Sequence, residues 1–152
     1  MFKKVPILIF FFLIFFVSFE DLYSKDEYFL TLRNEKVNLR QGPSFDYPVK
    51  ILYKKKFLPV LIQDSSDNFR KIRDHENNSG WVHISQLSKR KAAIVIKEEL
   101  ILFSKSTIFS NPVALLKEGR LVKISKCKIK WCKVKTGKYK GWVSKNGLWG
   151  LF

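Results

Sequence analysis

The chain has few of the residues from which active sites are usually built. Its 152 residues include two His, two Cys and one Met, and 13 acidic residues face 29 Lys and Arg. The spacings of His75 with His83, and of Cys127 with Cys132, do not match common zinc-ligand spacings. The acidic residues show no paired arrangement suited to glycoside hydrolysis. We therefore predict no catalytic residue, no metal site and no cofactor.

Cysteine is also missing from the end of the longest apolar run, residues 5–19, which argues against a lipoprotein anchor. The run reads VPILIFFFLIFFVSF after Lys3-Lys4, and it is shorter than a typical membrane-spanning helix but typical of a secretory signal. No clean cleavage pattern follows, although Ser18 or Ser24 could supply the small residue. We expect residues 1–24 to be a signal-peptide helix or, alternatively, an uncleaved anchor. The protein is then exported, to the periplasm or cell envelope.

Negative charge is scarce, and the formal net charge is +16. The leader contributes nothing to this excess, because Lys3 and Lys4 balance Glu20 and Asp21. A charge of this size favours anionic partners, such as wall polymers, lipopolysaccharide, membrane surfaces or nucleic acid. It is equally consistent with a Lys-rich composition and a solvated surface.

Three short segments occur twice, in the same order. Residues 46–49 (DYPV) match 110–113 (SNPV), 68–72 (NFRKI) match 130–134 (KWCKV), and 80–82 match 141–143 (both GWV). The offsets are 64, 62 and 61 residues. A repeat of this kind predicts two tandem units, 36–90 and 99–152.

Both units favour β-structure, because their apolar stretches are short, rich in Val, Ile, Phe and Trp, and separated by turn residues. We expect strands near 36–40, 49–53, 57–64, 68–73 and 80–84, and near 99–104, 113–116, 120–127, 131–136 and 141–145. Five short antiparallel strands curl most readily into a small barrel, which removes exposed edges. We expect the apolar segment 92–96 to pack between the two barrels as an extended strand.

The motif Val37-Asn38-Leu39-Arg40-x-Gly42-Pro43, followed by Tyr47-Pro48-Val49 and Gly80-Trp81-Val82, resembles the bacterial SH3-like (SH3b) domain family. The second unit is similar through Trp131-x-x-Val134 and Gly141-Trp142-Val143 but is degenerate, with residues 104–107 (SKST) in place of the Arg-x-Gly-Pro corner. The leader and the closing Leu148-Trp149-Gly150 are similar to exported tandem-SH3 proteins of Gram-negative bacteria. The resemblance implies an all-β fold of two tandem SH3-like barrels and a non-enzymatic binding role. The sequence outside the repeats is too short for the Cys-His peptidase domain of wall hydrolases that carry such modules.

The corner at residues 40–43 ends a strand, because Gly42 can adopt a positive φ and Pro43 fixes its own φ. The resemblance implies that the long RT-type loop of SH3 domains begins here. Arg40 has two interpretations. It is either a structural cation that holds the loop, through Asp46 or backbone carbonyls, or a guanidinium that faces the ligand.

Cys127 and Cys132 flank a plausible hairpin turn, residues 128–131 (KIKW). An even number of cysteines in an exported protein favours a disulfide, so we predict a Cys127–Cys132 bond. The alternation set by Val122 and Ile124 gives Cys127 the wrong parity to face the core. Either a β-bulge near Ser125 restores the register, or the cysteines face away from the core.

Aromatic residues are interleaved with lysines, most densely in residues 123–140. Flat rings stack on sugars or peptide side chains, and lysines bind carboxylates and phosphates. We interpret Trp81 and Trp142 as core or loop-packing residues, and Trp131 and Tyr139 as more exposed. The candidate ligand-binding residues are Arg40, Tyr47, Phe69, Trp131, Tyr139, Lys128 and Lys130.

The leading functional hypothesis is an exported binding module that recognises an anionic envelope component: peptidoglycan, lipopolysaccharide or an envelope protein. One alternative is a scaffolding protein whose barrels contact protein partners. The other is a basic nucleic-acid-binding barrel, against which the leader argues, because an exported protein meets little nucleic acid. We expect membrane contact only through an uncleaved leader.

Overall fold

The fold is taken from a computed structural model that describes residues 26–151. The predicted leader, residues 1–24, lies outside the described residues. No helix among residues 26–151 is long and apolar enough to cross a membrane.

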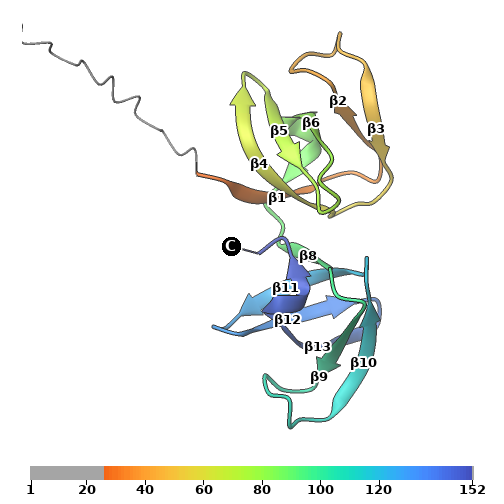
Figure 1. The fold of residues 1–152 in the computed structure, drawn as a ribbon, viewed down its shortest axis with the longest axis vertical. Helices are drawn as coiled ribbons and strands as arrows, with labels where there is room; N and C mark the ends of the chain where they lie inside the picture. The colour runs from red at the N-terminus through yellow and green to blue at the C-terminus, as the bar shows by residue number, and fades with distance from the viewer. Residues whose placement is uncertain (1–25, 152) are drawn as a thin grey trace, which may run out of the picture.

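The chain forms two seven-stranded antiparallel sheets, one after the other in the sequence (Figure 1). The first, barrel 1, contains β1 (Tyr28–Leu32), β2 (Val37–Arg40), β3 (Val49–Tyr53), β4 (Pro59–Ser66), β5 (Phe69–Arg73), β6 (Ser79–His83) and β7 (Leu87–Ser88). The second, barrel 2, contains β8 (Ala92–Val95), β9 (Glu99–Phe103), β10 (Pro112–Lys117), β11 (Leu121–Cys127), β12 (Trp131–Thr136), β13 (Tyr139–Ser144) and β14 (Leu148–Trp149). A 3-10 turn precedes the last strand of each barrel, η1 (Ile84–Gln86) and η2 (Lys145–Gly147). The predicted all-β fold with two tandem SH3-like barrels is confirmed.

Each barrel begins one strand earlier than the sequence repeat suggested. The strand orders are β3-β2-β6-β5-β4-β1-β7 and β10-β9-β13-β12-β11-β8-β14, so β1 and β8 occupy equivalent places. The boundaries expected from sequence, 36–90 and 99–152, therefore leave out one strand of each barrel. These two strands escaped the repeat search because YFLTL and AAIV share no residue pattern.

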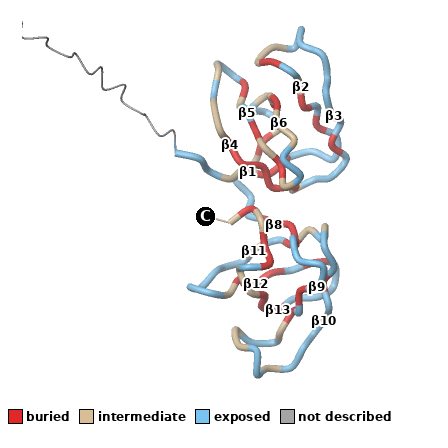
Figure 2. The backbone as a smooth tube through the Cα atoms, in the orientation of Figure 1, coloured by how far each residue is buried: buried red, intermediate tan, exposed pale blue. Residues whose placement is uncertain are grey.

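Alternation along the strands builds one apolar core in each barrel. Successive side chains of a strand point to opposite faces of the sheet, so in strands such as β2 and β6 every second residue is buried (Figure 2). The core of barrel 1 is made by Leu32, Val37, Leu39, Tyr53, Leu58, Val60, Ile62, Ile72, Val82, Leu87 and Ile94. The core of barrel 2 is made by Ala93, Val95, Leu100, Leu102, Leu116, Val122, Cys132, Val134, Val143 and Leu148.

The two barrels share residues at their junction. β8 is buried on both faces: Ala93 and Val95 face the core of barrel 2, while Ile94 joins the core of barrel 1. Trp149 also packs against the core of barrel 1, with its ring edge-on to Phe29 at 4.8 Å. The segment 92–96 is therefore extended and lies between the barrels, as predicted. It is not a separate connector, because it pairs with β11 and β14 inside the second sheet.

Matching pairs in the two ladders define equivalent residues of the two barrels. In barrel 1, Arg40 pairs with Trp81, and in barrel 2 Phe103 pairs with Trp142 in the same place. One residue further on, the Gln41 N–H donates to Pro48 O in barrel 1. The Ser104 N–H donates to Asn111 O in barrel 2. The offset is thus 63 residues around this loop, and Pro48 corresponds to Asn111. The sequence match of Pro48 with Pro112 is one residue out, because a two-residue Pro-Val motif is too short to define a ladder register. The counterpart of the corner at 40–43 is consequently 103–106, not 104–107.

Between the β4–β5 hairpin of barrel 1 and the β11–β12 hairpin of barrel 2, the offset between equivalent residues is 62. Ile62 pairs with Ile72 as Ile124 pairs with Val134, and each ladder then shifts by one residue. The shift in barrel 2 falls between Ile124 and Lys126, so of the two alternatives left open by the sequence, the β-bulge near Ser125 is present. A bulge in the same place in barrel 1 indicates that this bend belongs to the barrel rather than to the cysteines.

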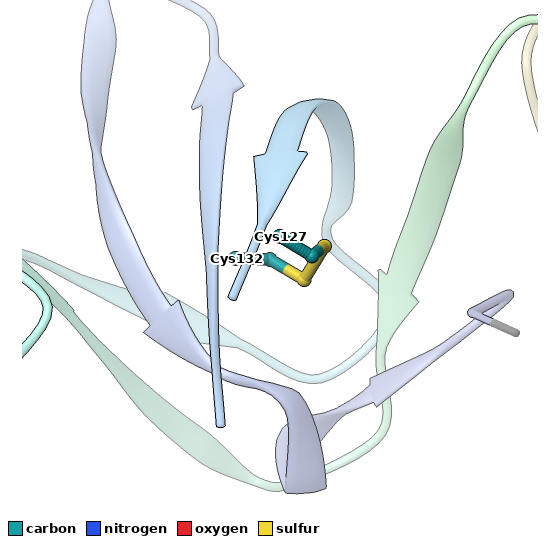
Figure 3. Close-up of a disulfide and its surroundings, with 2 residues drawn as sticks. All are labelled: Cys127 and Cys132. Carbon is teal, nitrogen blue, oxygen red and sulfur yellow. A yellow bond between two sulfur atoms is a disulfide. The ribbon is translucent and has the colours of Figure 1, made fainter. Parts of the chain in front are cut away.

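The bulge lets the disulfide form without disturbing the core. Cys127 and Cys132 are directly opposite each other and are bonded, with their Cα atoms 4.0 Å apart (Figure 3). Cys132 is fully buried in the core of barrel 2, whereas Cys127 is exposed. The predicted disulfide is confirmed, and it staples the hairpin between β11 and β12.

A buried carboxylate organises the polar loop that follows β5. Asp74 is 1% exposed and accepts four hydrogen bonds: from the Tyr53 hydroxyl at 2.8 Å, from the Glu76 N–H, and from the N–H and side-chain amide of Asn78. Burial, together with this hydrogen bond, raises the pKa of Tyr53 well above its usual value. The phenol therefore stays protonated and remains a donor to Asp74.

Candidate ligand-binding site

A groove on barrel 1 combines aromatic, cationic and polar side chains. It has a volume of about 350 Å³ and lies where the loop after β2 meets the ends of β5 and β6. Its lining residues are Lys36, Asn38, Arg40, Phe45, Leu52, Phe69, His83, Ser85 and Gln86.

Three rings form the aromatic wall of the groove. Phe69 and His83 are cross-strand partners whose ring centroids are 5.2 Å apart, edge to face. Phe45 comes from the loop and lies 5.2 Å from Phe69 and 5.1 Å from His83. Phe69 is buried, but Phe45 is 63% exposed, so one face of the cluster is open to a ligand.

Arg40 holds the loop that carries Phe45. Its Nη1 donates to the carbonyl oxygens of Phe45 at 3.0 Å and Tyr47 at 2.8 Å, and its guanidinium lies 5.5 Å from the centroid of the Phe45 ring. The structural interpretation through backbone carbonyls therefore describes its contacts. Asp46 hydrogen-bonds Ser44 instead. Arg40 also lines the groove, beside the three rings.

Gly42 is required for a different reason from the one expected. The glycines with positive φ in the described part of the chain are Gly119, Gly137 and Gly150. At Gly42 the ring of Tyr47 packs directly on the backbone, and a Cβ there would lie 2.6 Å from three ring carbons. Gly42 and the neighbouring Pro43 thus shape the loop, and Tyr47 is a packing residue of that loop, although about half exposed.

His83 and Ser85 form the one pair in the groove that resembles a nucleophile and a base. His83 Nδ1 lies 2.8 Å from Ser85 Oγ and also accepts from the Ser85 N–H, which makes His83 the N-cap of η1. The His83–Ser85 contact is thus a local cap of η1. Residues 26–151 contain no group of three His, Cys, Asp or Glu side chains placed to hold a metal ion.

The structure does not bring the other predicted site residues into this groove. Trp131 is half-buried in barrel 2, edge-on to Phe103 at 5.8 Å. Tyr139 is exposed beside Lys138, at the opposite end of the β12–β13 ladder from Trp131. Lys128 and Lys130 lie in the hairpin turn closed by the disulfide.

The two Gly-Trp-Val tryptophans lie on outer faces of their strands, next to buried glycine and valine. Trp142 is only 8% exposed, because the amines of Lys126, Lys128 and Lys133 lie 4.9–5.9 Å from its ring centroid. Trp81 is half-buried. The expected packing role therefore describes Trp142, but the packing partners are lysine side chains rather than the core.

Barrel 2 lacks a copy of the groove. Its residues equivalent to Arg40, Phe45 and His83 are Phe103, Ile108 and Ser144, by the register of the ladders. Only the position of Phe69 stays aromatic, as Trp131. The cation and two of the three rings are lost, so the candidate site belongs to barrel 1.

Sequence reasoning missed His83 and gave Phe45 little weight. Alternation already placed His83 on the face opposite Val82, where it directly neighbours Phe69 across the ladder. The missing information was the cross-strand register, which would have made Phe69 and His83 partners. The position of Phe45 depends on the fold of the loop, for which alternation carries no signal.

A comparison with protein-family models agrees with this architecture. The family model described as "Bacterial SH3 domain" matches residues 33–89 and 97–150. No curated protein matches the chain. Two solved structures from Trichomonas vaginalis are similar in part. NlpC2 is 12% identical, with a TM-score of 0.38, and the match covers 82% of this chain and 48% of NlpC2. NlpC1 is 13% identical, with a TM-score of 0.37, and the match covers 81% of this chain and 45% of NlpC1. The chain thus spans about half the length of each. The two matches of the family model cover most of the described residues, and the chain belongs to the bacterial SH3 domain family, with two tandem domains.

Proposed function

We propose that the protein is an exported, non-enzymatic binding module that recognises a peptide or glycan of the cell envelope through the groove of barrel 1. Membership of the bacterial SH3 family supports a binding role in the envelope. The observation that carries the proposal is the open face of the Phe45, Phe69 and His83 cluster beside the guanidinium of Arg40.

The groove suits a ligand with both a flat apolar face and an anionic group. The aromatic cluster offers a large apolar surface on which the apolar face of a sugar or a peptide side chain can stack. Arg40 and Lys36 line the same groove and offer charge-assisted hydrogen bonds to a carboxylate. Peptidoglycan stem peptides and their sugars combine these features, which makes them the ligand class we favour.

The loop is fixed before the ligand arrives. Arg40 already bonds two carbonyls of the loop, and Tyr47 packs on Gly42. Little conformational entropy is then lost when a ligand settles against Phe45, and this favours affinity.

The test is binding of soluble peptidoglycan fragments to residues 26–152, which contain both complete sheets, measured by calorimetry. Phe45→Ala removes the exposed ring, and we expect affinity to fall about tenfold, from the loss of one stacking partner and its buried area. Ile108→Ala is the matched control, because Ile108 is the equivalent residue of barrel 2 and is similarly exposed.

Equal binding by both variants would overturn the proposed site. Absence of binding to any peptidoglycan fragment, with co-purification of a defined envelope protein through barrel 1, would favour the scaffolding role instead.

A further inference from the structure

Two loop tips at one end of barrel 2 expose large apolar side chains to solvent. Ile108 and Phe109 are at the tip of the loop between β9 and β10, and Ile129 is at the tip of the β11–β12 hairpin. Ile108 is 65% exposed, Phe109 92% and Ile129 91%. Single exposed apolar residues are common, but three on neighbouring tips form a feature that requires an explanation. We call these three residues the apolar tips.

The apolar tips are held next to each other. Lys128 Nζ donates to Ser106 Oγ at 3.1 Å, which links the hairpin to the other loop, and the same amine lies 4.9 Å from the ring centroid of Trp142. The disulfide of Cys127 closes the turn that carries Ile129. The tips are therefore presented by two tied loops, so little entropy is lost when they bind.

Barrel 1 has aspartates in place of two of the three apolar tips, Phe109 and Ile129, whereas the equivalent of Ile108 is Phe45. In the loops, the Tyr47 N–H closes a turn in barrel 1, and the Ser110 N–H closes the same turn in barrel 2. The residues just before them, Asp46 and Phe109, are therefore equivalent. In the hairpins, Ser66 pairs with Phe69 in barrel 1, and the Lys128 N–H donates to Trp131 O at the same place in barrel 2. The next residues along the chain, Asp67 and Ile129, are therefore equivalent. The bulge pairs make Asp64 the equivalent of Lys126. Three acidic positions of one barrel are thus apolar or cationic in the other.

The surroundings of the apolar tips are strongly basic. Residues 92–151 contain 13 Lys and Arg and 3 Asp and Glu, a net charge of +10, whereas residues 26–91 contain 13 and 8, a net charge of +5. No acidic residue follows Glu118. The four lysines nearest the tips in the sequence are Lys105, Lys126, Lys128 and Lys130.

We propose that this end of barrel 2 docks on an anionic phospholipid bilayer. The apolar tips enter the boundary between head groups and acyl chains, and the surrounding lysines bind the head-group phosphates. Apolar residues ringed by cations are the combination that holds proteins at such an interface. The net charge alone pointed to membrane surfaces among several anionic partners; what is new is the assignment of a bilayer contact to this end of barrel 2 rather than to residues 1–24.

The shape and chemistry of the tips favour a bilayer over other anionic partners. A peptide or sugar is bound best in a concave site, whereas Phe109 and Ile129 project from loop ends with nine-tenths of their surface exposed. Single-stranded nucleic acid would gain from the lysines and from stacking on Phe109, but aliphatic Ile108 and Ile129 offer no stacking face. A partner with a fluid apolar interior accepts all three tips without needing a matching pocket for each.

The expected strength is moderate and reversible. Each lysine close to an anionic surface contributes roughly a fivefold increase in partitioning. Burial of a Phe or Ile side chain contributes on the order of tenfold. The electrostatic part should weaken with salt, because ions screen it.

The test is co-sedimentation of residues 26–152 with lipid vesicles, which removes the leader from the question. The vesicles are phosphatidylcholine alone, or phosphatidylcholine with one quarter phosphatidylglycerol, in about 0.15 M salt. We expect binding to the anionic vesicles and little to the neutral ones. Circular dichroism and thermal unfolding check that every variant is folded.

Two pairs of substitutions separate the two contributions. Phe109→Asp with Ile129→Asp installs the residues of barrel 1, and we expect binding to fall about a hundredfold or more. Lys105→Gln with Lys130→Gln leaves the tips and the Lys128–Ser106 bond in place, and we expect a fall of roughly 25-fold.

The matched controls are Leu115→Asp, a half-exposed residue in the middle of β10, and Lys54→Gln with Lys71→Gln, two exposed lysines of barrel 1. We expect the controls to bind like the parent protein. Equal binding to neutral and anionic vesicles would overturn the proposal, and so would control variants that lose as much as the tip variants. Loss of peptidoglycan binding by the tip variants, without vesicle binding by the parent, would also overturn it. The groove of barrel 1 is tested with other residues and another ligand, so either proposal can fail alone.

Discussion

The two barrels have the same frame and different surfaces. Equivalent core positions carry similar apolar residues, such as Val60 with Val122 and Ile72 with Val134, and both sheets have a bulge in the same place. Equivalent surface positions differ in kind: Arg40 corresponds to Phe103, and Asp67 to Ile129. The apolar core and the ladders are enough to specify the barrel, which leaves each surface free to acquire its own partner.

The difference is largest where a polar group is buried. Asp74 of barrel 1 accepts four hydrogen bonds, whereas the equivalent residue of barrel 2 is Thr136, whose hydroxyl donates one bond to Leu121 O. Tyr53, the donor to Asp74, corresponds to Leu116. Barrel 1 thus depends on a buried polar network that barrel 2 replaces with apolar contact.

The largest effect is expected from this network. Asp74→Ala leaves Tyr53 and the amides of the loop without a partner, and we expect a loss of about 3–5 kcal/mol in the stability of barrel 1. Thr136→Ala should cost about 1 kcal/mol in barrel 2. Urea unfolding followed by circular dichroism measures both. If the two substitutions cost the same, the network does not distinguish the barrels.

The next effect concerns the disulfide, which barrel 1 lacks. Reduction of the Cys127–Cys132 bond should destabilise barrel 2 by about 2 kcal/mol, since the closed loop is short. Barrel 1 should unfold at the same denaturant concentration with and without reductant. Thiol titration of the unfolded, unreduced protein should find no free thiol, and two titratable thiols in protein purified from the envelope would contradict the bond.

An effect of similar size is expected at the loop corner. Gly42→Ala places a Cβ against the Tyr47 ring, and we expect a loss of about 1–3 kcal/mol, as for other overpacked sites, together with weaker ligand binding in the groove. The equivalent residue in barrel 2 is Lys105, so Lys105→Ala serves as the control and should be nearly neutral. Thermal unfolding of the two variants makes the comparison, and unchanged stability of Gly42→Ala would show that the Tyr47 ring can move aside.

The features that sequence could predict are those that depend on alternation and on local pairing. The core strands follow from the order of apolar residues, and the disulfide was predicted from the even number of cysteines. The parity of Cys127 reduced the choice to a bulge near Ser125 or cysteines that face away from the core. Strand β1 was missed, and β8 was predicted as an extended strand but not as part of barrel 2, because β1 and β8 have different sequences and their equivalence is recognised only from the strands they pair with. Asp74 lies in a loop of polar residues, DHENNS, in which an exposed side chain is the usual expectation, and only the fold brings Tyr53 to it. The groove likewise depends on the conformation of the loop between β2 and β3. Contacts of Arg40 and Gly42 with this loop set that conformation, and the alternation of apolar residues does not predict them.

The smallest effect distinguishes the two ways in which the barrels hold the equivalent loop. In barrel 1 the Arg40 guanidinium donates to two loop carbonyls, whereas in barrel 2 the Ser110 hydroxyl lies within hydrogen-bonding distance of the carbonyl oxygens of Lys105 and Thr107 and of the Lys105 N–H. Arg40→Gln and Ser110→Ala should each cost about 1 kcal/mol, because each loses partly exposed hydrogen bonds. Only Arg40→Gln should also weaken binding of peptidoglycan fragments, since Arg40 both holds Phe45 and lines the groove. If Ser110→Ala weakens that binding equally, the ligand contacts both barrels, and the assignment of the ligand site to barrel 1 alone is wrong.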